Sequence, residues 1–166
     1  MSLFQNIIVI MLLISAAGFL SLTEIALAGA RKVKLKILAE SGEIRAQKVL
    51  DLQQQSADFF AASQIGLNAI AILGGILGEG AFRPYFVEFV TRFYTGPWLE
   101  TIGFALSFTL VTSLFILFAD LMPKRLAMIA PEKISISVIE PIQIFIKICK
   151  PLAWGINAIA NLLFRL

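Results

Sequence analysis

Long apolar runs, each broken by a few polar residues, dominate the hydrophobic pattern of this 166-residue chain. Three runs approach or exceed the roughly 20 residues that a helix needs to cross a bilayer: residues 7–29, 59–77 and 102–122. We therefore predict three transmembrane helices. The composition supports this interpretation, because 58% of the residues are hydrophobic, 15% are charged and the mean hydropathy is +0.87. A water-soluble domain of this length could not bury so much apolar surface, so the fold class is an all-α membrane protein.

Charges between the runs predict the orientation of the chain. Residues 31–58 and the segment after residue 122 are rich in lysine and arginine, whereas residues 78–101 carry only Arg83 and Arg92 against three glutamates. Basic loops stay on the cytoplasmic side. We therefore expect a multi-pass protein of the inner (plasma) membrane, with the N-terminus outside and the C-terminus in the cytoplasm.

The basic loop has the pattern of a cytosolic helical hairpin. Apolar residues recur at helical spacing on both sides of Glu40-Ser41-Gly42, where the glycine is suited to the position after a helix end. They are Leu35, Leu38 and Ala39 before the break, and Ala46, Val49 and Leu50 after it. A solvated charged linker is the alternative, but a linker has no need of an apolar stripe.

Residues 132–165 are apolar again but carry a polar stripe. Polar side chains recur there every three or four residues, which favours helices that lie in the membrane interface as a juxtamembrane belt. Pro141 is expected to interrupt this segment and Pro151 to end its first helix. A fourth span over residues 134–148 remains the alternative.

Oxygen-bearing side chains inside the runs are the candidate metal ligands: Ser21 and Thr23 in the first, Ser63 and Asn68 in the second, and Asp120 in the third. A carboxylate at the bilayer centre costs about 2.5–3.5 kcal/mol on insertion scales, so Asp120 needs a partner if it is buried. Hydroxyl, amide and carboxylate oxygens suit hard cations such as Mg²⁺, Ca²⁺, Mn²⁺ or Na⁺. The plain alternative is that the hydroxyls bond backbone carbonyls of their own helices or join neighbouring helices.

Helix geometry adds two expectations. On an ideal α-helix Thr109, Ser113 and Asp120 share one face, and the small-xxx-small spacing of Gly74 and Gly78 predicts a close helix contact.

The chain has no histidine and a single cysteine, which excludes imidazole ligands, His-dependent catalysis and a disulfide within the chain. We therefore expect no enzyme activity.

Four sequence elements resemble the transmembrane domain of the CorC/CNNM magnesium transporters. They are Phe19–Leu27, Ala30-Arg31-Lys32 with Leu38–Gly42, Gln64-Ile65-Gly66, and Asp120-Leu121-Met122-Pro123-Lys124. The resemblance covers nearly the whole chain. It implies a homodimer with three transmembrane helices, short cytosolic helices and a belt helix. It also implies Mg²⁺ export, with Na⁺ as a proposed coupling ion, and a Mg²⁺ site formed by oxygens of all three spans.

The residues of this chain can be matched to the family pattern one by one, and several of them differ from it. Ser21 matches the first hydroxyl of the Ser-x-Ser-Glu pattern of that family, Thr23 replaces the second hydroxyl, and Asp120 stands in place of a glutamate. Asn68 is displaced by one position, or about 100° around a helix, so Ser63 could supply the oxygen instead. Glu24 matches the acid of the pattern. We expect it to hold the turn after the first span by pairing with Lys124 or Arg125, although its spacing from Ser21 also permits ligation.

Members of that family normally continue into cytosolic CBS domains, so we expect residues 1–166 to be the membrane domain alone, without nucleotide regulation. The expected partners are a second copy of the chain, membrane lipid and the CBS domains of a longer chain, with no nucleic acid. A module that senses Mg²⁺ or anchors cytosolic domains without transporting ions is the alternative function.

Overall fold

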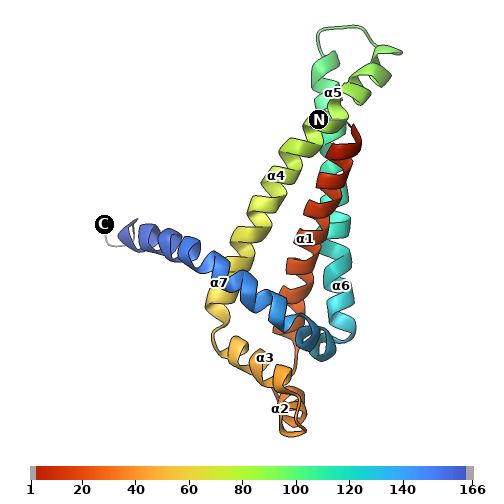
Figure 1. Ribbon diagram of the computed structural model, residues 1–166. Helices are drawn as coiled ribbons and strands as arrows, with labels where there is room; N and C mark the ends of the chain where they lie inside the picture. Colours follow the sequence, from red (N-terminus) through yellow and green to blue (C-terminus); the bar gives the residue numbers. More distant parts are fainter. Residues whose placement is uncertain (1–2, 164–166) are drawn as a thin grey trace. The chain divides into compact units, whose positions relative to one another are not determined.

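The computed structural model describes residues 3–163, and its description of side chains leaves out residues 58, 150 and 152–163. The chain forms α1 (Leu3–Gly29), α2 (Lys32–Glu40), α3 (Ile44–Gln54), α4 (Ser56–Thr91), α5 (Leu99–Leu114), the π-helical segment η1 (Phe115–Leu121), α6 (Met122–Ile129) and α7 (Pro131–Leu163) (Figure 1). Helices and their connections account for all of the described residues, and no strand occurs among them. The all-helical prediction is confirmed.

Three helical stretches of the described residues are long and apolar enough to cross a membrane: Leu3–Gly29, Phe59–Thr91 and Leu99–Ile129. The number of spans agrees with the sequence prediction, and α7 is not among them. The helices are longer than the apolar runs. In particular, α4 continues to Thr91 instead of ending near residue 77, because residues such as Glu79 and Glu88 are good helix formers although they are not apolar.

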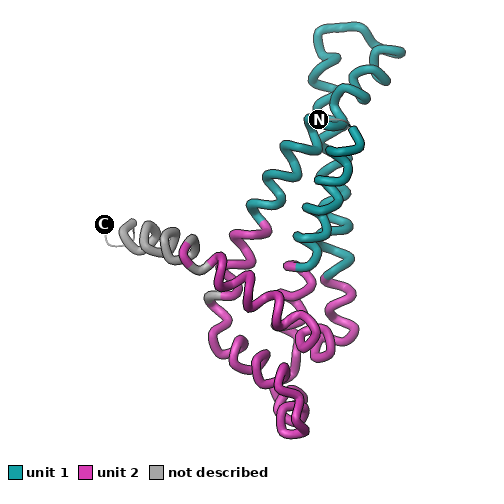
Figure 2. Tube along the Cα trace, viewed as in Figure 1, with its two compact units in different colours: residues 1–19, 68–123 teal, residues 20–67, 124–166 magenta. Residues whose placement is uncertain are grey.

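Two compact units divide the chain (Figure 2): unit 1 comprises residues 1–19 and 68–123, and unit 2 comprises residues 20–67 and 124–166. Unit 1 contains the close contact that the glycines of α4 predict. A Cβ atom at Gly78 would lie 2.5 Å from Val111 Cγ1, and one at Gly74 would overlap the ring of Phe115. The prediction of a close contact at these glycines is therefore confirmed within unit 1, where the partners are residues of α5 and η1.

Unit 2 contains the predicted helical hairpin, formed by α2 and α3. Gly42 has a positive φ of 101°, the conformation that glycine tolerates best after a helix end. The backbone N–H of Glu43 donates to the Leu38 carbonyl at 3.0 Å and closes the turn. Leu35 of α2 and Ala46 and Val49 of α3 are fully buried. The helical hairpin is therefore confirmed and the linker alternative is wrong, but the stripe packs only in part, because Leu38 is exposed and Ala39 is half-buried.

One continuous helix, α7, replaces the interrupted segment that Pro141 and Pro151 predict. That prediction is wrong at both prolines. Pro141 is exposed, while Ile139 and Ile142 on either side of it are fully buried. Packing of this apolar face offsets the backbone hydrogen bond that the proline removes.

Candidate functional site

Three of the five predicted ligands lie in unit 2, and all three are buried. Ser21 and Thr23 on α1 and Ser63 on α4 each have 0% relative exposure. The two helices touch beside them, because a Cβ atom at Gly66 would lie 3.0 Å from Leu20 Cδ1. Leu20 precedes Ser21 directly, and Ser63 lies about one helical turn before Gly66. The hydroxyls therefore flank a close contact between α1 and α4.

Ser63 differs from the other buried serines in its hydrogen bonding. Ser107 and Ser135 are equally buried, and their hydroxyls donate to the carbonyls of Phe104 and Glu132, each at 2.9 Å. Among the described residues, Ser63 Oγ has no hydrogen-bond partner. Leaving a buried hydroxyl unpaired costs about 1–3 kcal/mol. The plain interpretation of a membrane hydroxyl holds for Ser107, and Ser135 makes the same kind of bond on α7 outside the candidate spans, but this interpretation does not explain Ser63.

Asn68 and Asp120, the other two predicted ligands, belong to unit 1. Asn68 on α4 is exposed, whereas Asp120 on η1 is half-buried. The predicted ligand set is thus divided, with three residues in unit 2 and two in unit 1. Within the part of the chain that the structure describes, no group of three or more His, Cys, Asp or Glu residues is placed to hold a metal ion.

The π-helical segment changes the face on which Asp120 lies. Sequence spacing places Thr109, Ser113 and Asp120 on one face only if the helix is α-helical throughout. A π turn holds about one residue more than an α turn, so Asp120 is turned by about 100° relative to an ideal α-helix. Thr109 and Ser113 are exposed while Asp120 is half-buried. The predicted shared face is therefore wrong, and the cause is a local feature without a signal in the apolar pattern.

Carboxylates of α7 anchor it to the hairpin of unit 2. Lys34 Nζ lies 3.4 Å from Glu132 Oε1, and Glu140 Oε1 lies 3.3 Å from Arg45 Nε and 3.6 Å from Lys48 Nζ. The Glu140 pairs are half exposed, so each contributes little by itself. Together they fix which face of α7 meets α3.

Glu132 is the more buried of these two acids, with a side chain only 13% exposed. Desolvation raises the pKa of its carboxyl. Hydrogen bonds from the backbone N–H groups of Glu132 and Arg31, together with the charge of Lys34, lower this pKa by more than desolvation raises it. The net pKa lies below the usual 4.5. Glu132 is therefore held as a carboxylate where α2 begins.

Gln53 of α3 is a positioning residue that the sequence analysis missed. Its Nε2 donates to the carbonyl of Leu27 at 2.8 Å and to that of Ala30 at 3.0 Å. Carbonyls at a helix end lack partners within the helix, so Gln53 caps α1 from a distant part of the chain. Nothing in the periodicity indicates this contact.

Glu24 is half-buried, and its pairing with Lys124 or Arg125 stays a prediction.

Arg83 forms a second charged cluster, in unit 1. Its guanidinium lies 2.9 Å from Glu100 Oε2 of α5 and 3.6 Å from Glu79 Oε1 of α4. The Glu100 side chain is 65% exposed and the Arg83 side chain 40%. This cluster therefore joins the polar ends of α4 and α5 at the surface of the unit.

These features define the class of the chain, a multi-pass helical membrane protein with polar side chains buried in its spans. Residues 8–166 match the family described as the Cyclin M transmembrane N-terminal domain, CNNM. The chain belongs to this family, which is the one that its sequence elements resemble.

Several relatives match nearly the whole chain. It is 48% identical over 162 residues to the polyamine export protein of Escherichia coli K12, covering 98% of this chain and 36% of the relative. It is 43% identical over 166 residues to the polyamine export protein of Haemophilus influenzae, covering 100% and 38%. It is 30% identical over 158 residues to a UPF0053 protein of Synechocystis, covering 95% and 35%. The chain thus spans little more than a third of the length of these relatives.

Proposed function

We propose that this chain is the membrane domain of an exporter of cations, and that its cargo is a polyamine. The observation that carries the proposal is the 48% identity, over 98% of the chain, to a protein named for polyamine export. The 43% identity to a second protein of the same name, from a different genus, supports it.

The candidate ligands have the chemistry that such a cargo needs. A polyamine carries ammonium groups, each with several N–H donors and no acceptor. Hydroxyl oxygens and a carboxylate accept these hydrogen bonds, and the carboxylate also balances the charge. Ser63 supplies a buried oxygen that accepts no hydrogen bond from the described residues, and Asp120 supplies a carboxylate within an apolar helix. Ser21 and Thr23 add two buried hydroxyls.

Mg²⁺ is the second candidate cargo, with Na⁺ as the coupling ion. The observation that favours it is the resemblance to the CorC/CNNM magnesium transporters, in which Ser21 matches the pattern, Thr23 keeps a hydroxyl and Asp120 keeps a carboxylate. The same oxygens suit a hard metal cation, which keeps some of its waters when few protein ligands are available. In both cases the transporting form is a homodimer of multi-pass chains in the inner membrane. Cytosolic CBS domains are its regulatory partners, where a longer chain carries them.

Transport into inside-out membrane vesicles tests the proposal. Vesicles that contain the protein should accumulate labelled putrescine, and Asp120→Asn should abolish accumulation because the charge is lost while the shape is nearly kept. Ser63→Ala should reduce accumulation several-fold.

Ser135→Ala is the matched control. It removes an equally buried hydroxyl, but one that donates to a backbone carbonyl within its own helix. Transport by this variant should equal that of the unaltered protein. Flux of Mg²⁺ without flux of putrescine would replace the first cargo with the second. Binding of either cation without flux would instead establish the sensing or anchoring function and refute transport.

A further inference from the structure

Two cavities of unit 2 adjoin at a single lysine, Lys32, in the first turn of α2. One cavity of about 210 Å³ is lined mainly by apolar side chains, among them Leu27, Phe59 and Phe60. The other, of about 800 Å³, is an open groove between α2 and α3, lined by five charged or amide side chains together with apolar ones, and is called the polar groove below. Lys32 lines both cavities, so its side chain stands where the apolar cavity meets a groove that also offers polar groups.

The apolar cavity lies where two candidate membrane spans end. Leu27 is two residues from the end of the span Leu3–Gly29, and Phe59 begins the span Phe59–Thr91. Helix ends of this kind lie at the level of the lipid headgroups. We therefore infer that the cavity lies at the membrane surface, whichever way the chain is oriented.

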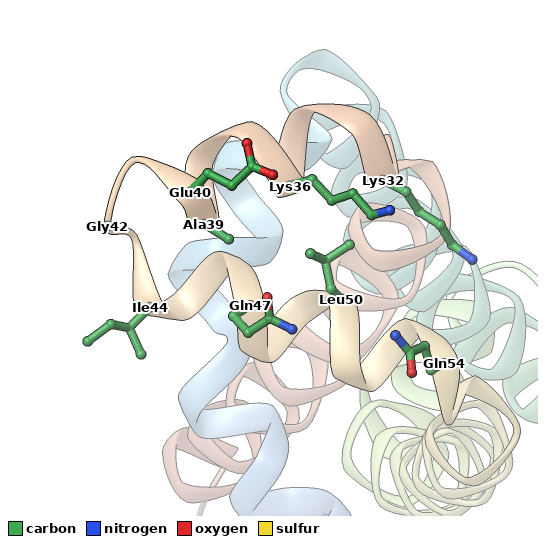
Figure 3. Close-up of a pocket in the computed structure, with 9 residues that line it drawn as sticks. All are labelled: Lys32, Lys36, Ala39, Glu40, Gly42, Ile44, Gln47, Leu50 and Gln54. Carbon is green, nitrogen blue, oxygen red and sulfur yellow. The ribbon is translucent and has the colours of Figure 1, made fainter.

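The polar groove continues away from this cavity along the hairpin. Lys32 and Lys36 of α2 and Gln47 and Gln54 of α3 line it (Figure 3). Among the side chains that the structure describes, Glu40 at the end of α2 is the one acidic residue that lines it. Ammonium and amide groups at the Lys32 end can donate hydrogen bonds to an anion.

The two lysines of the groove differ from the other basic residues of the hairpin. Lys34, Arg45 and Lys48 form ion pairs with the glutamates of α7. Among the side chains that the structure describes, neither Lys32 nor Lys36 takes part in such a pair. Their charge is therefore available to an anionic ligand.

We propose that these cavities form a binding site for an anionic phospholipid. The phosphate of the headgroup contacts Lys32 and lies at the Lys32 end of the polar groove, and an acyl chain enters the apolar cavity against Phe60. A phospholipid has the same order of parts as the site, because its charged phosphate joins a polar headgroup to apolar chains. Neither Ser21 nor Ser63 lines these cavities, and the proposal does not depend on the identity of the transported cation.

Lipid binding to the purified full chain tests the proposal. Native mass spectrometry or a fluorescent lipid should show that phosphatidylglycerol binds more tightly than phosphatidylcholine with the same acyl chains. Lys32→Gln should lower the affinity for phosphatidylglycerol about fivefold, which is the typical value of one basic side chain near an anionic surface. It should leave the affinity for phosphatidylcholine unchanged.

Lys133→Gln is the matched control, because it removes the same charge from an exposed lysine of unit 2 that lines neither cavity. Its affinity for phosphatidylglycerol should equal that of the unaltered protein. Ala28→Phe, which places a ring at the apolar cavity, should weaken the binding of both lipids.

Three results would overturn the proposal. Equal losses for Lys32→Gln and Lys133→Gln would show a diffuse attraction to the positive surface. Full affinity in Ala28→Phe would show that no acyl chain enters the cavity. Competition by glycerol phosphate at the same concentration as the lipid would show a site for soluble phosphates.

Discussion

Replacing Gly78 with alanine would measure how closely α4 approaches α5 in unit 1. The added Cβ atom would lie 2.5 Å from Cγ1 and 2.7 Å from Cγ2 of Val111. Val111 is 1% exposed, and a valine in a helix has one strongly preferred side-chain rotamer. The valine therefore cannot turn away, and the helices must separate.

The size of the effect follows from two opposing contributions. Overpacking of this kind costs about 1–3 kcal/mol of unfolding free energy, while replacing glycine by alanine within a helix gains about 1 kcal/mol. Gly80 provides the reference, because nothing lies within 4 Å of a Cβ atom at that position. Gly80→Ala should therefore gain about 1 kcal/mol of unfolding free energy without any cost from overpacking. Gly78→Ala should therefore be less stable than Gly80→Ala by about 1–3 kcal/mol, which is the packing contribution itself.

Equilibrium unfolding of the purified protein in detergent, followed by circular dichroism, measures both variants. Adding Val111→Ala to Gly78→Ala removes the clashing methyl groups, so the double variant should be more stable than the sum of the two single effects. Equal stability of Gly78→Ala and Gly80→Ala would refute the reasoning, because it would mean that the helices do not touch at this point.

Three further predictions concern charge and orientation. The folded-state pKa of Glu132 is lowered, so its carboxylate stabilises the protein above the unfolded value of 4.5 and that stability is lost as the pH falls toward the folded pKa. Thermal unfolding below about pH 4.5 should therefore depend less on pH in Glu132→Gln, and an unchanged slope would contradict this. Arg83→Gln should change the unfolding free energy by less than about 1 kcal/mol, because the ion pair is partly exposed; a larger loss would show a buried role. With Cys149 replaced by serine, a cysteine at Ser41 should resist an impermeant thiol reagent in intact cells while one at Thr95 reacts, and the reverse pattern would invert the topology.

The fold could be predicted from the sequence where one local signal decides the outcome. Three apolar runs gave three spans because the length requirement is set by the bilayer. Gly42 ended α2 as predicted, because few residues other than glycine adopt its positive φ. The end of α4 could not be predicted in this way. Hydropathy marks where lipid ends, whereas helix propensity allowed residues 78–91 to continue the helix.

Features that depend on distant contacts were not predictable. From the sequence, Pro141 predicts a helix break. Only the structure shows that Ile139 and Ile142 beside it are buried and hold the helix together. Gln53 reads as an ordinary polar residue, although it caps α1. For the candidate site, the sequence identified Ser63 as a possible oxygen ligand. Only the structure shows that its hydroxyl has no hydrogen-bond partner among the described residues, whereas the hydroxyl of Ser107 donates to a carbonyl of its own helix.

The π-helical segment η1 has a consequence for which insertions and deletions the chain can tolerate. In an α-helix, residues four apart advance by about 40° around the axis, so a stripe with that spacing drifts off its face. The buried positions of α5, η1 and the start of α6 fall at multiples of four residues: Gly103, Ser107, Val111, Ala119 and Pro123. The extra residue of the π turn removes about 100° of the accumulated rotation. Deleting one residue between Phe115 and Leu121 would restore an ordinary α-helix and leave Pro123-Lys124 on the same face, because the π turn already takes up one residue more than an α turn. Deleting a second residue would turn them by about 100°. This short segment can therefore lose one residue, but not two, without changing the face on which the following helix lies.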